Sequence, residues 1–140
     1  MKYLLDTCVI SELIQKVPAP SVLSWINAQA EEHLFLSVLT MGELRKGINL
    51  LVSGKKRRDL ETWLENDLEK RFVERWLPIS LEVSECWGAM SARAQLAGNP
   101  LPVLDSLLAA TAITHGCTLV TRNTRDMFAT GVVLLNPWVS

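Results

Sequence analysis

The segment Tyr3-Leu4-Leu5-Asp6-Thr7 places an acid directly after a short apolar run near the start of the chain. The run, from residue 2 to residue 6, is typical of a buried strand that carries the Asp6 carboxylate to its carboxyl end. In open α/β sheets, ligands bind at that edge of the sheet. Asp6 is therefore the first candidate functional residue, although Asp is also a common N-cap of a following helix.

The rest of the chain alternates between strand-like and helix-like segments. We predict further strands at residues 33–37, 76–80, 118–121 and 132–135, and helices at residues 9–15, 21–30, 38–52, 59–71, 83–97 and 104–115. Strands separated by helices favour parallel pairing through crossover helices, and such a sheet is covered on both faces. The sequence therefore predicts an α/β fold, and its 140 residues predict one domain over residues 1–140.

Cysteine usage and hydropathy restrict the cellular compartment. Cys8, Cys86 and Cys117 are widely spaced and form no CxxC pair. This pattern indicates a reducing cytosol and argues against a disulfide framework or a zinc site. No apolar stretch reaches the roughly 18 residues that cross a bilayer, and Asp6 interrupts the N-terminal run too early for a signal peptide. We therefore expect a cytoplasmic protein with no membrane contact.

The formal net charge of −1 gives the chain no overall attraction to nucleic acid. A polyanion would have to meet a local basic patch, and the best candidate is the run Lys55-Lys56-Arg57-Arg58. The same run would also suit the solvated start of a helix, with ion pairs four residues apart at Lys55–Asp59 and Arg57–Glu61. Of the two interpretations, we favour the helix start.

Glu43 lies on the helix expected after the second strand. It shares one stripe of that helix with Leu39, Gly47 and Leu50, which is not an obviously solvated face. A surface glutamate that pairs with Lys46 or faces solvent is an equally good interpretation. Position on the stripe alone does not decide between a site residue and a solvated one.

Asp105 begins the last long helix expected along the chain. It could cap that helix, but Leu108 occupies the position at which a reciprocal capping box needs Glu or Gln. Asp105 also heads a stripe of small residues formed by Ala109, Ala112 and Gly116. Such a stripe would let the helix pack close to the sheet and carry the acid toward the strand ends.

The turn Thr121-Arg122-Asn123 follows the strand expected at residues 118–121. It supplies a hydroxyl, a cation and a neutral oxygen ligand, and Asp126 lies one helical turn further on. Each of these residues is ordinary in a turn. Their place after a strand of the predicted sheet makes them candidates for the same site as Asp6.

A site that gathers several carboxylates needs a cation. At an effective dielectric constant of 20, two carboxylates about 4 Å apart repel by roughly 4 kcal/mol. Three together would remove a large share of the stability of a domain. Oxygen ligands without His or Cys favour Mg²⁺ or Mn²⁺ over zinc. A metal of this kind suits phosphodiester hydrolysis, because it activates water and screens the charge on the phosphate.

Four segments of the chain, taken together, resemble the four motifs of PIN-domain ribonucleases. They are Tyr3-Leu4-Leu5-Asp6-Thr7, Met41-Gly42-Glu43-Leu44, the stretch at residues 105–112 and Leu119-Val120-Thr121-Arg122-Asn123. More narrowly, the chain is similar to VapC-type toxins of type II toxin–antitoxin pairs, including their FitB-like branch. The likeness runs from Met1 to Asn136-Pro137-Trp138, and so covers essentially the whole chain.

The resemblance implies a three-layer α/β/α sandwich with a central parallel sheet. It implies a Mg²⁺- or Mn²⁺-dependent endoribonuclease that acts as a toxin, forms a homodimer and is blocked by a small antitoxin. Asp6, Glu43 and Asp105 would be the metal-binding acids, with Thr7 and Thr121 as supporting hydroxyls. In our leading hypothesis, and not as an implication of the resemblance itself, Arg122 and the run at residues 55–58 would contact the RNA backbone.

The chain departs from the family pattern at two positions. Relatives usually have Asn where this chain has Cys8, so local hydrogen bonding must differ there or the position is tolerant. The fourth acid of some relatives falls on Asn123, whose amide oxygen would still ligate a metal. The site then has one negative charge fewer and a second metal should bind more weakly. Asp126 would compensate, either directly or through a water.

Two other functional classes compete with the nuclease. A phosphatase with an aspartyl nucleophile after its first strand needs a second Asp two residues on, where this chain has Cys8. A non-catalytic PIN-fold module that binds RNA or protein would not need three acids.

Tryptophans are frequent anchors of protein interfaces, but each of the five here would also suit the core. They are Trp25, Trp63, Trp76, Trp87 and Trp138.

Overall fold

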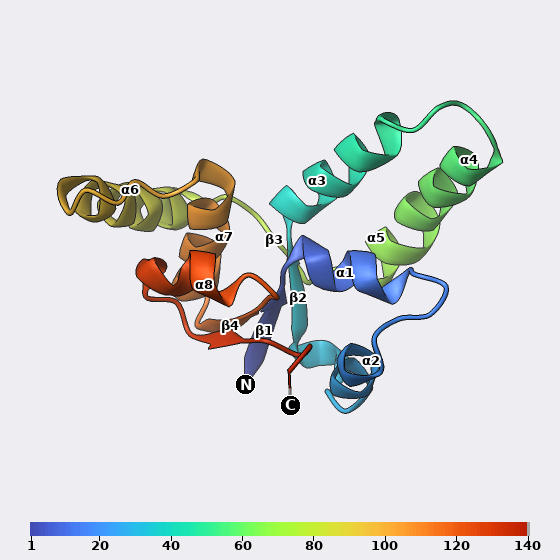
Figure 1. The fold of residues 1–140 in the computed structure, drawn as a ribbon, viewed down its shortest axis with the longest axis horizontal. Coiled ribbons are helices and arrows are strands. Elements are labelled where there is room, and N and C mark those ends of the chain that lie inside the picture. The colour runs from blue at the N-terminus through green and yellow to red at the C-terminus, as the bar shows by residue number, and fades with distance from the viewer. Residues whose placement is uncertain (140) are drawn as a thin grey trace.

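The structure is a computed structural model, and it describes residues 1–139. A parallel sheet of five strands in the order β3-β2-β1-β4-β5 forms its centre (Figure 1). The strands are β1 (Lys2–Leu5), β2 (Leu34–Ser37), β3 (Trp76–Leu77), β4 (Cys117–Val120) and β5 (Leu134–Leu135). Because β1 lies in the middle, the chain segments that follow β1, β2 and β4 meet at one edge of the sheet.

Alternate residues of the central strands enter two separate hydrophobic cores. In β1, Leu5 packs into one core and Leu4 into the other; in β4, Val120 and Leu119 divide in the same way. This division follows from the period of two along a strand, which sends successive side chains to opposite faces. Both faces of the sheet are therefore buried, and the predicted three-layer α/β/α sandwich with a central parallel sheet is confirmed.

Different sets of helices cover the two faces of the sheet. The core that contains Leu5 is filled from α1, α2, α3 and η2, and the core that contains Leu4 is filled from α6, α7 and α8. Within residues 1–139, no helix is long and apolar enough to cross a membrane. The α-helices are α1 (Thr7–Leu13), α2 (Pro20–Asn27), α3 (Val38–Asn49), α4 (Lys55–Thr62), α5 (Glu69–Arg71), α6 (Leu81–Leu96), α7 (Val103–Thr114) and α8 (Thr124–Met127).

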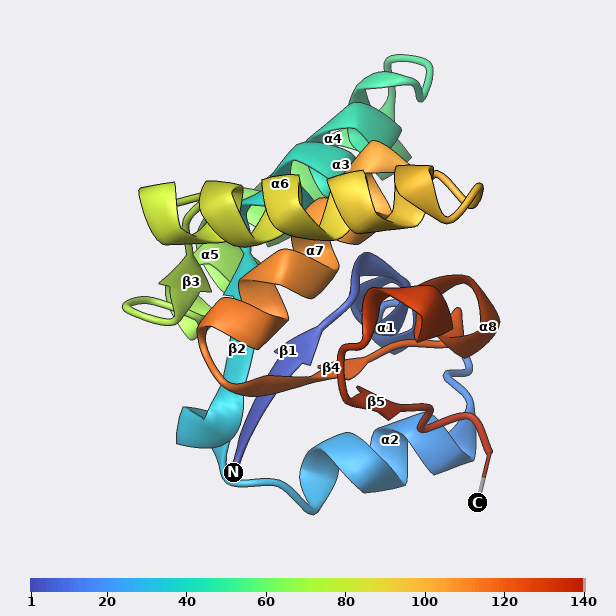
Figure 2. The same ribbon diagram turned by 90° about the vertical axis from the view of Figure 1, so that its left-hand side faces the viewer.

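Three shorter helical segments complete the chain. The 3₁₀ helices are η1 (Glu31–His33) and η3 (Phe128–Thr130), and η2 (Trp63–Leu68) is a π-helix between α4 and α5. In Figure 1, α3 and α4 form a hairpin that projects from the sheet. Figure 2 shows α6 outermost on the opposite side, packed across α7. The projecting hairpin and the α6–α7 pair flank the edge at which the strands end.

Several predicted boundaries are wrong. The helix expected at residues 59–71 begins at Lys55, because the basic run forms its first turn, and it passes through the π-helix η2. The strand expected at residues 76–80 has two residues and ends before Ser80, whose hydroxyl accepts a hydrogen bond from the backbone N–H of Val83 at 3.2 Å and so caps α6. The helix expected at residues 38–52 ends at Asn49. The capping hydroxyl of Ser80 thus accounts for the short strand, and the basic run accounts for the longer helix.

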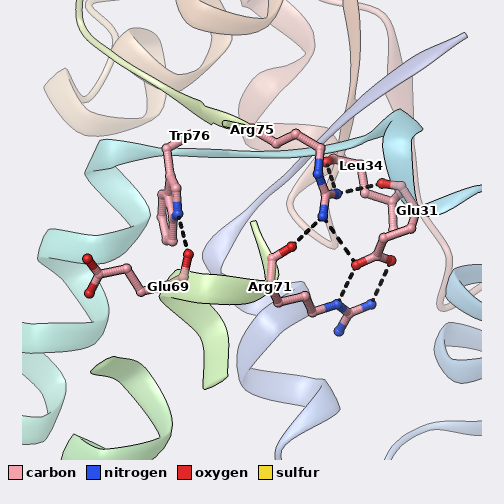
Figure 3. Close-up of polar contacts among 6 residues, drawn as sticks. All are labelled: Glu31, Leu34, Glu69, Arg71, Arg75 and Trp76. Atoms are coloured by element: carbon pink, nitrogen blue, oxygen red, sulfur yellow. Dashed lines mark hydrogen bonds and ion pairs between the residues drawn. The ribbon is translucent and has the colours of Figure 1, made fainter. Parts of the chain in front are cut away.

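Arg75 joins the end of α5 to the start of β2 (Figure 3). Its guanidinium donates hydrogen bonds to the backbone carbonyls of Glu31 at 2.5 Å and Leu34 at 2.7 Å, and to that of Arg71. It also lies 4.8 Å from the ring centroid of Phe72, which is fully buried. The cluster was not predicted from the sequence, because most of the acceptors of Arg75 are backbone carbonyls.

Glu31 completes the cluster with a carboxylate. Arg71 donates to both of its oxygens, at 2.7 and 3.2 Å. The hydrogen bond from Arg71, with the charges of Arg71 and Arg75, lowers the pKa of Glu31. Nearby, the indole N–H of Trp76 donates to the carbonyl of Glu69 at 3.2 Å. These contacts fix α5 against the edge of the sheet formed by β2 and β3.

Replacement of Arg75 by methionine should destabilise the fold. The substitution keeps much of the side-chain length but leaves the carbonyls of Glu31 and Leu34 without their donor, which should cost about 1–3 kcal/mol. Urea unfolding measures the change, with Arg58→Met as the matched control, because Arg58 is exposed and makes no side-chain hydrogen bond within residues 1–139. Equal unfolding free energies for the two variants would contradict the structural role of Arg75.

Candidate active site

Asp6 occupies the end of β1 and joins it to the end of β4. Its backbone is extended, and it is the N-cap of α1: its Oδ1 accepts a hydrogen bond from the backbone N–H of Thr7 at 2.7 Å. Its Oδ2 accepts one from the hydroxyl of Thr121 at 2.8 Å. The side chain is only 7% exposed. The capping interpretation of Asp6 is therefore confirmed, and the same carboxylate also faces the loop of the neighbouring strand, while its role in a functional site stays a prediction.

Glu43 comes to the same place from α3, which follows β2. The hydroxyl of Thr7 donates to Glu43 Oε1 at 2.7 Å and lies 3.1 Å from the hydroxyl of Thr40. Glu43 is exposed, and within residues 1–139 it forms no ion pair with Lys46. The solvated interpretation is thus right about exposure and wrong about the partner. Thr7 and Thr121 each hold the carboxylate of an acid, at the positions where the sequence led us to expect supporting hydroxyls.

Asp105 reaches the site from α7. Asp105 is the third residue of that helix, and the N-cap residue is Pro102. The prediction that Asp105 could cap the helix is therefore wrong. Burial raises the pKa of Asp105, and the negative charges of Asp126 and Glu43 raise it further. The four acids therefore share one electrostatic environment, although they come from different elements.

The pKa of Asp6 is also raised. Burial is the main cause; hydrogen bonds from Thr121 and Thr7 act in the opposite direction, and the charge of Asp105 adds to the rise.

Asn123 is the N-cap residue of α8, and its backbone N–H donates to the Thr121 hydroxyl at 3.0 Å. Asn123 is exposed. The loop after β4 thus contributes an amide, a hydroxyl and, through α8, the carboxylate of Asp126.

The residues present suit a hard divalent cation in their chemistry. Carboxylate, hydroxyl and amide oxygens lie near the end of β1, and the charges of neighbouring acids add to the effect of burial in raising the pKa of Asp6 and of Asp105. In the part of the chain that the structure describes, no three His, Cys, Asp or Glu side chains lie close enough together to hold one ion. Binding of a single ion by three acids would therefore require side chains to rearrange.

An open groove of about 1230 Å³ reaches Glu43 and extends between α1, α3 and α4. Thr7, Cys8 and Glu43 belong to its lining, and so do the apolar side chains of Leu51 and Trp63. The groove was not predicted from the sequence, because its apolar wall combines segments that each look like ordinary helix faces.

Residues 3–131 of the chain match the PIN domain family. The chain belongs to that family. It is 39% identical over 134 residues to VapC ribonuclease Y4jK of Sinorhizobium fredii, with 96% of each chain covered. It is 37% identical over 135 residues to toxin FitB of Neisseria gonorrhoeae, with 96% of this chain and 97% of FitB covered. The predicted resemblance to PIN-domain ribonucleases of the VapC and FitB type is thereby confirmed.

The crystal structure of FitAcB from Neisseria gonorrhoeae supports the same conclusion. This PIN domain superposes on a chain of that structure with a TM-score of 0.93 at 36% identity, and 99% of each chain is covered. The agreement extends over both layers of helices as well as the sheet. The fold of the chain is therefore that of its family throughout residues 1–139.

Cys8 gives this PIN domain a thiol beside the acids. Its Sγ lies 3.8 Å from the hydroxyl oxygen of Thr121. Burial raises the pKa of Cys8, and the charge of Asp6 raises it further. The thiol therefore stays protonated at neutral pH when no cation is bound, and it is poorly suited to act as a nucleophile.

The basic run at the start of α4 is partly neutralised. Lys55 pairs with Asp59 at 2.7 Å and Arg57 with Glu61 at 3.3 Å, so the predicted helix-start interpretation is confirmed for both. Within residues 1–139, Lys56 and Arg58 form no ion pair, and Lys56 lines the groove. Lys56 is thus the member of the run best placed for a ligand in the groove.

Replacement of Asp105 by asparagine should stabilise this PIN domain at neutral pH without added metal. An acid whose pKa is raised by folding adds stability below its unfolded pKa and loses it as the pH rises through the folded value. Asparagine removes this loss, and the gain should stay below about 1 kcal/mol because the side chain is only partly buried. Urea unfolding in EDTA should show the gain at pH 7.5 and not near pH 4, close to the ordinary pKa of aspartate.

Glu85→Gln is the control for this measurement. Glu85 is an exposed acid on α6 whose side chain makes no hydrogen bond or ion pair within residues 1–139. It should change the unfolding free energy little at either pH. A loss of stability in Asp105→Asn at pH 7.5 would contradict the electrostatic description of the site.

Proposed function

We propose that this PIN domain is a Mg²⁺- or Mn²⁺-dependent endoribonuclease and the toxin of a toxin–antitoxin pair. The observation that carries the proposal is electrostatic: the charge of Asp105 acts on Asp6, and the charges of Glu43 and Asp126 act on Asp105, although the four acids come from different elements. Relatives that match over 96% of this chain support it, because one is named a VapC ribonuclease and another a toxin.

Asp6, Glu43 and Asp105 would hold the metal, with Asn123 and Asp126 as further oxygen ligands. A divalent cation in this place supplies an activated water and screens the charge that develops on the phosphate. The chain itself orients the ligands. Thr121 holds Oδ2 of Asp6 and Thr7 holds Oε1 of Glu43, so that each of these carboxylates keeps its other oxygen for a ligand or a backbone amide.

Local basic residues explain how a protein without net positive charge would bind RNA. The net charge is −1, so attraction of the RNA backbone depends on local cations. Lys56 and Arg122 line the groove beside the acids, and Lys55, Arg57 and Arg58 lie in the same helical turn as Lys56 or next to it. The ion pairs of Lys55 and Arg57 make them the weaker contacts of the set.

Loss of any metal-binding acid should abolish RNA cleavage. Substitution of outer-shell partners of metal sites costs about 10–100-fold, so Asp6→Asn, Glu43→Gln and Asp105→Asn should each lower the cleavage rate by at least about 100-fold. Cleavage of a labelled RNA by purified protein, freed of any inhibitor, measures the effect in Mg²⁺, in Mn²⁺ and in EDTA. Glu85→Gln should match the parent in all three.

Two outcomes would overturn the nuclease. One is intact RNA after incubation of the parent protein with either metal. The other is growth inhibition on expression that is as strong for Asp6→Asn and Asp105→Asn as for the parent, which would favour the non-catalytic binding module. The single domain over residues 1–140, the homodimer and the cytoplasmic location stay predictions.

The antitoxin would block the site by occupying the groove. Leu51, Leu60 and Trp63 supply apolar contacts, and Glu43 gives a partner cation an acid to meet. A groove of about 1230 Å³ accommodates several side chains of a bound segment. Such a segment would cover Thr7 and Glu43, and would therefore exclude RNA from the acids.

A charge placed in the apolar lining should release the antitoxin. Leu51→Glu should weaken antitoxin binding by at least about tenfold, because the carboxylate would have to be buried in the complex. Leu50→Glu is the matched control, since Leu50 is 76% exposed and does not line the groove. Titration calorimetry measures both affinities, and equal values would show that the antitoxin docks elsewhere.

A further inference from the structure

Arg122 is stacked against a tryptophan beside the acids. It directly follows Thr121, which binds Asp6, and its guanidinium carbon lies 4.7 Å from the ring centroid of Trp138. Arg122 and Trp138 both line the groove that contains Thr7 and Glu43. A cation and an aromatic ring from two separate loops therefore form one wall next to the candidate active site.

The indole ring is itself fixed from two sides of the fold. Its Nε1–H donates to Oε1 of Glu12 at 3.2 Å, and the other oxygen of Glu12 accepts from the backbone N–H of Ala19 at 3.2 Å. The backbone N–H of Trp138 donates to Oδ1 of Asn136 at 2.9 Å. Glu12 thus connects α1, the loop before α2 and the indole, and the ring cannot turn without breaking its hydrogen bond to Glu12.

The guanidinium keeps its donors available. Within residues 1–139, Arg122 forms no ion pair, and its side chain donates no hydrogen bond. A ring that covers one face of a guanidinium leaves the N–H groups in its plane free to bind an acceptor. Because these donors form a rigid fork that matches two oxygens of a phosphate, a phosphate is the ligand best suited to the site.

We propose that Glu12 and Trp138 are positioning residues that hold Arg122 ready to bind an RNA phosphate next to the one that is cleaved. The inference rests on the proposed function. An arginine in water samples many rotamers, and it loses this freedom when it binds. Stacking on Trp138 restricts the rotamers before RNA arrives, so that more of the interaction with the phosphate appears as affinity.

The alternative is that Trp138 only anchors the end of the chain. Its carbonyl accepts a hydrogen bond from the hydroxyl of Ser21 in α2 at 3.4 Å, and its indole packs against the core on that side of the sheet. An anchor alone would affect stability and leave the Arg122 contact unchanged. The two roles therefore differ in whether removal of Trp138 changes the contribution of Arg122.

A double-mutant cycle on RNA binding distinguishes them. In an Asp105→Asn background with Mg²⁺, fluorescence anisotropy follows short single-stranded oligo-U and oligo-A RNAs over a range of salt concentrations. Arg122→Gln should weaken binding of both by about tenfold, as for a charge-assisted hydrogen bond. It should also reduce the slope of log affinity against log salt by about 0.7, the value for one phosphate contact on a single strand.

Trp138→Leu should reproduce much of the loss of affinity and of the reduction in salt slope, although this substitution leaves the charge of the protein unchanged. The double variant should bind no more weakly than Arg122→Gln alone, and Arg93→Gln, an exposed cation on α6, should bind like the parent. If Trp138→Leu does not fold at the assay temperature, Trp138→Phe replaces it, since phenylalanine keeps a ring face and loses only the bond to Glu12. Its loss should be smaller and equally non-additive with Arg122→Gln.

Additive effects, or an unchanged salt slope in Trp138→Leu and Trp138→Phe, would overturn the positioning role. A loss confined to one of the two RNAs would overturn the phosphate as the ligand. If the parent protein neither binds nor cuts RNA, the proposed function fails and this inference fails with it. If the parent cuts RNA and the cycle is additive, this inference alone is wrong.

Discussion

The site depends on a buried carboxylate held at the end of the central strand. Asp6 is almost fully removed from water, and the resulting rise of its pKa is only partly offset by hydrogen bonds from Thr7 and Thr121. The parallel register that pairs Leu5 with Val120 brings the two loops close enough for these bonds. Because Thr7 also binds Glu43, the position of Asp6 sets that of the second acid. The remaining acids approach this pair from α7 and α8.

Local patterns predicted the parts of the fold that are encoded locally. The alternation of apolar strands with amphipathic helices gave the parallel sheet, and the acid after the first strand gave Asp6. The Arg75 cluster could not be predicted in this way, since its acceptors are backbone carbonyls that any residue would offer. The early start of α4 was open to prediction, because Lys55–Asp59 and Arg57–Glu61 have helical spacing.

The acids of the candidate site were predicted from the sequence, but the groove and the contacts around them were not. Asp6, Glu43 and Asp105 were recognisable because each lies in one of the short segments that resemble the motifs of PIN-domain ribonucleases. The contact between Glu12 and Trp138 joins residues 126 positions apart, and neither has a local pattern that points to the other. The groove is likewise a product of how α3 and α4 project from the sheet. Such features arise only when distant elements pack together.

The acids that would hold a metal also repel the substrate. In a chain of net charge −1, the field near Asp6 and Asp105 opposes a phosphate until a cation is bound, and few local cations counter it. Long side chains in water would provide a weak and disordered attraction. Stacking on a fixed ring gives one guanidinium a defined place instead. For a site of this charge, the position of Arg122 relative to the acids therefore matters more than the total number of basic residues.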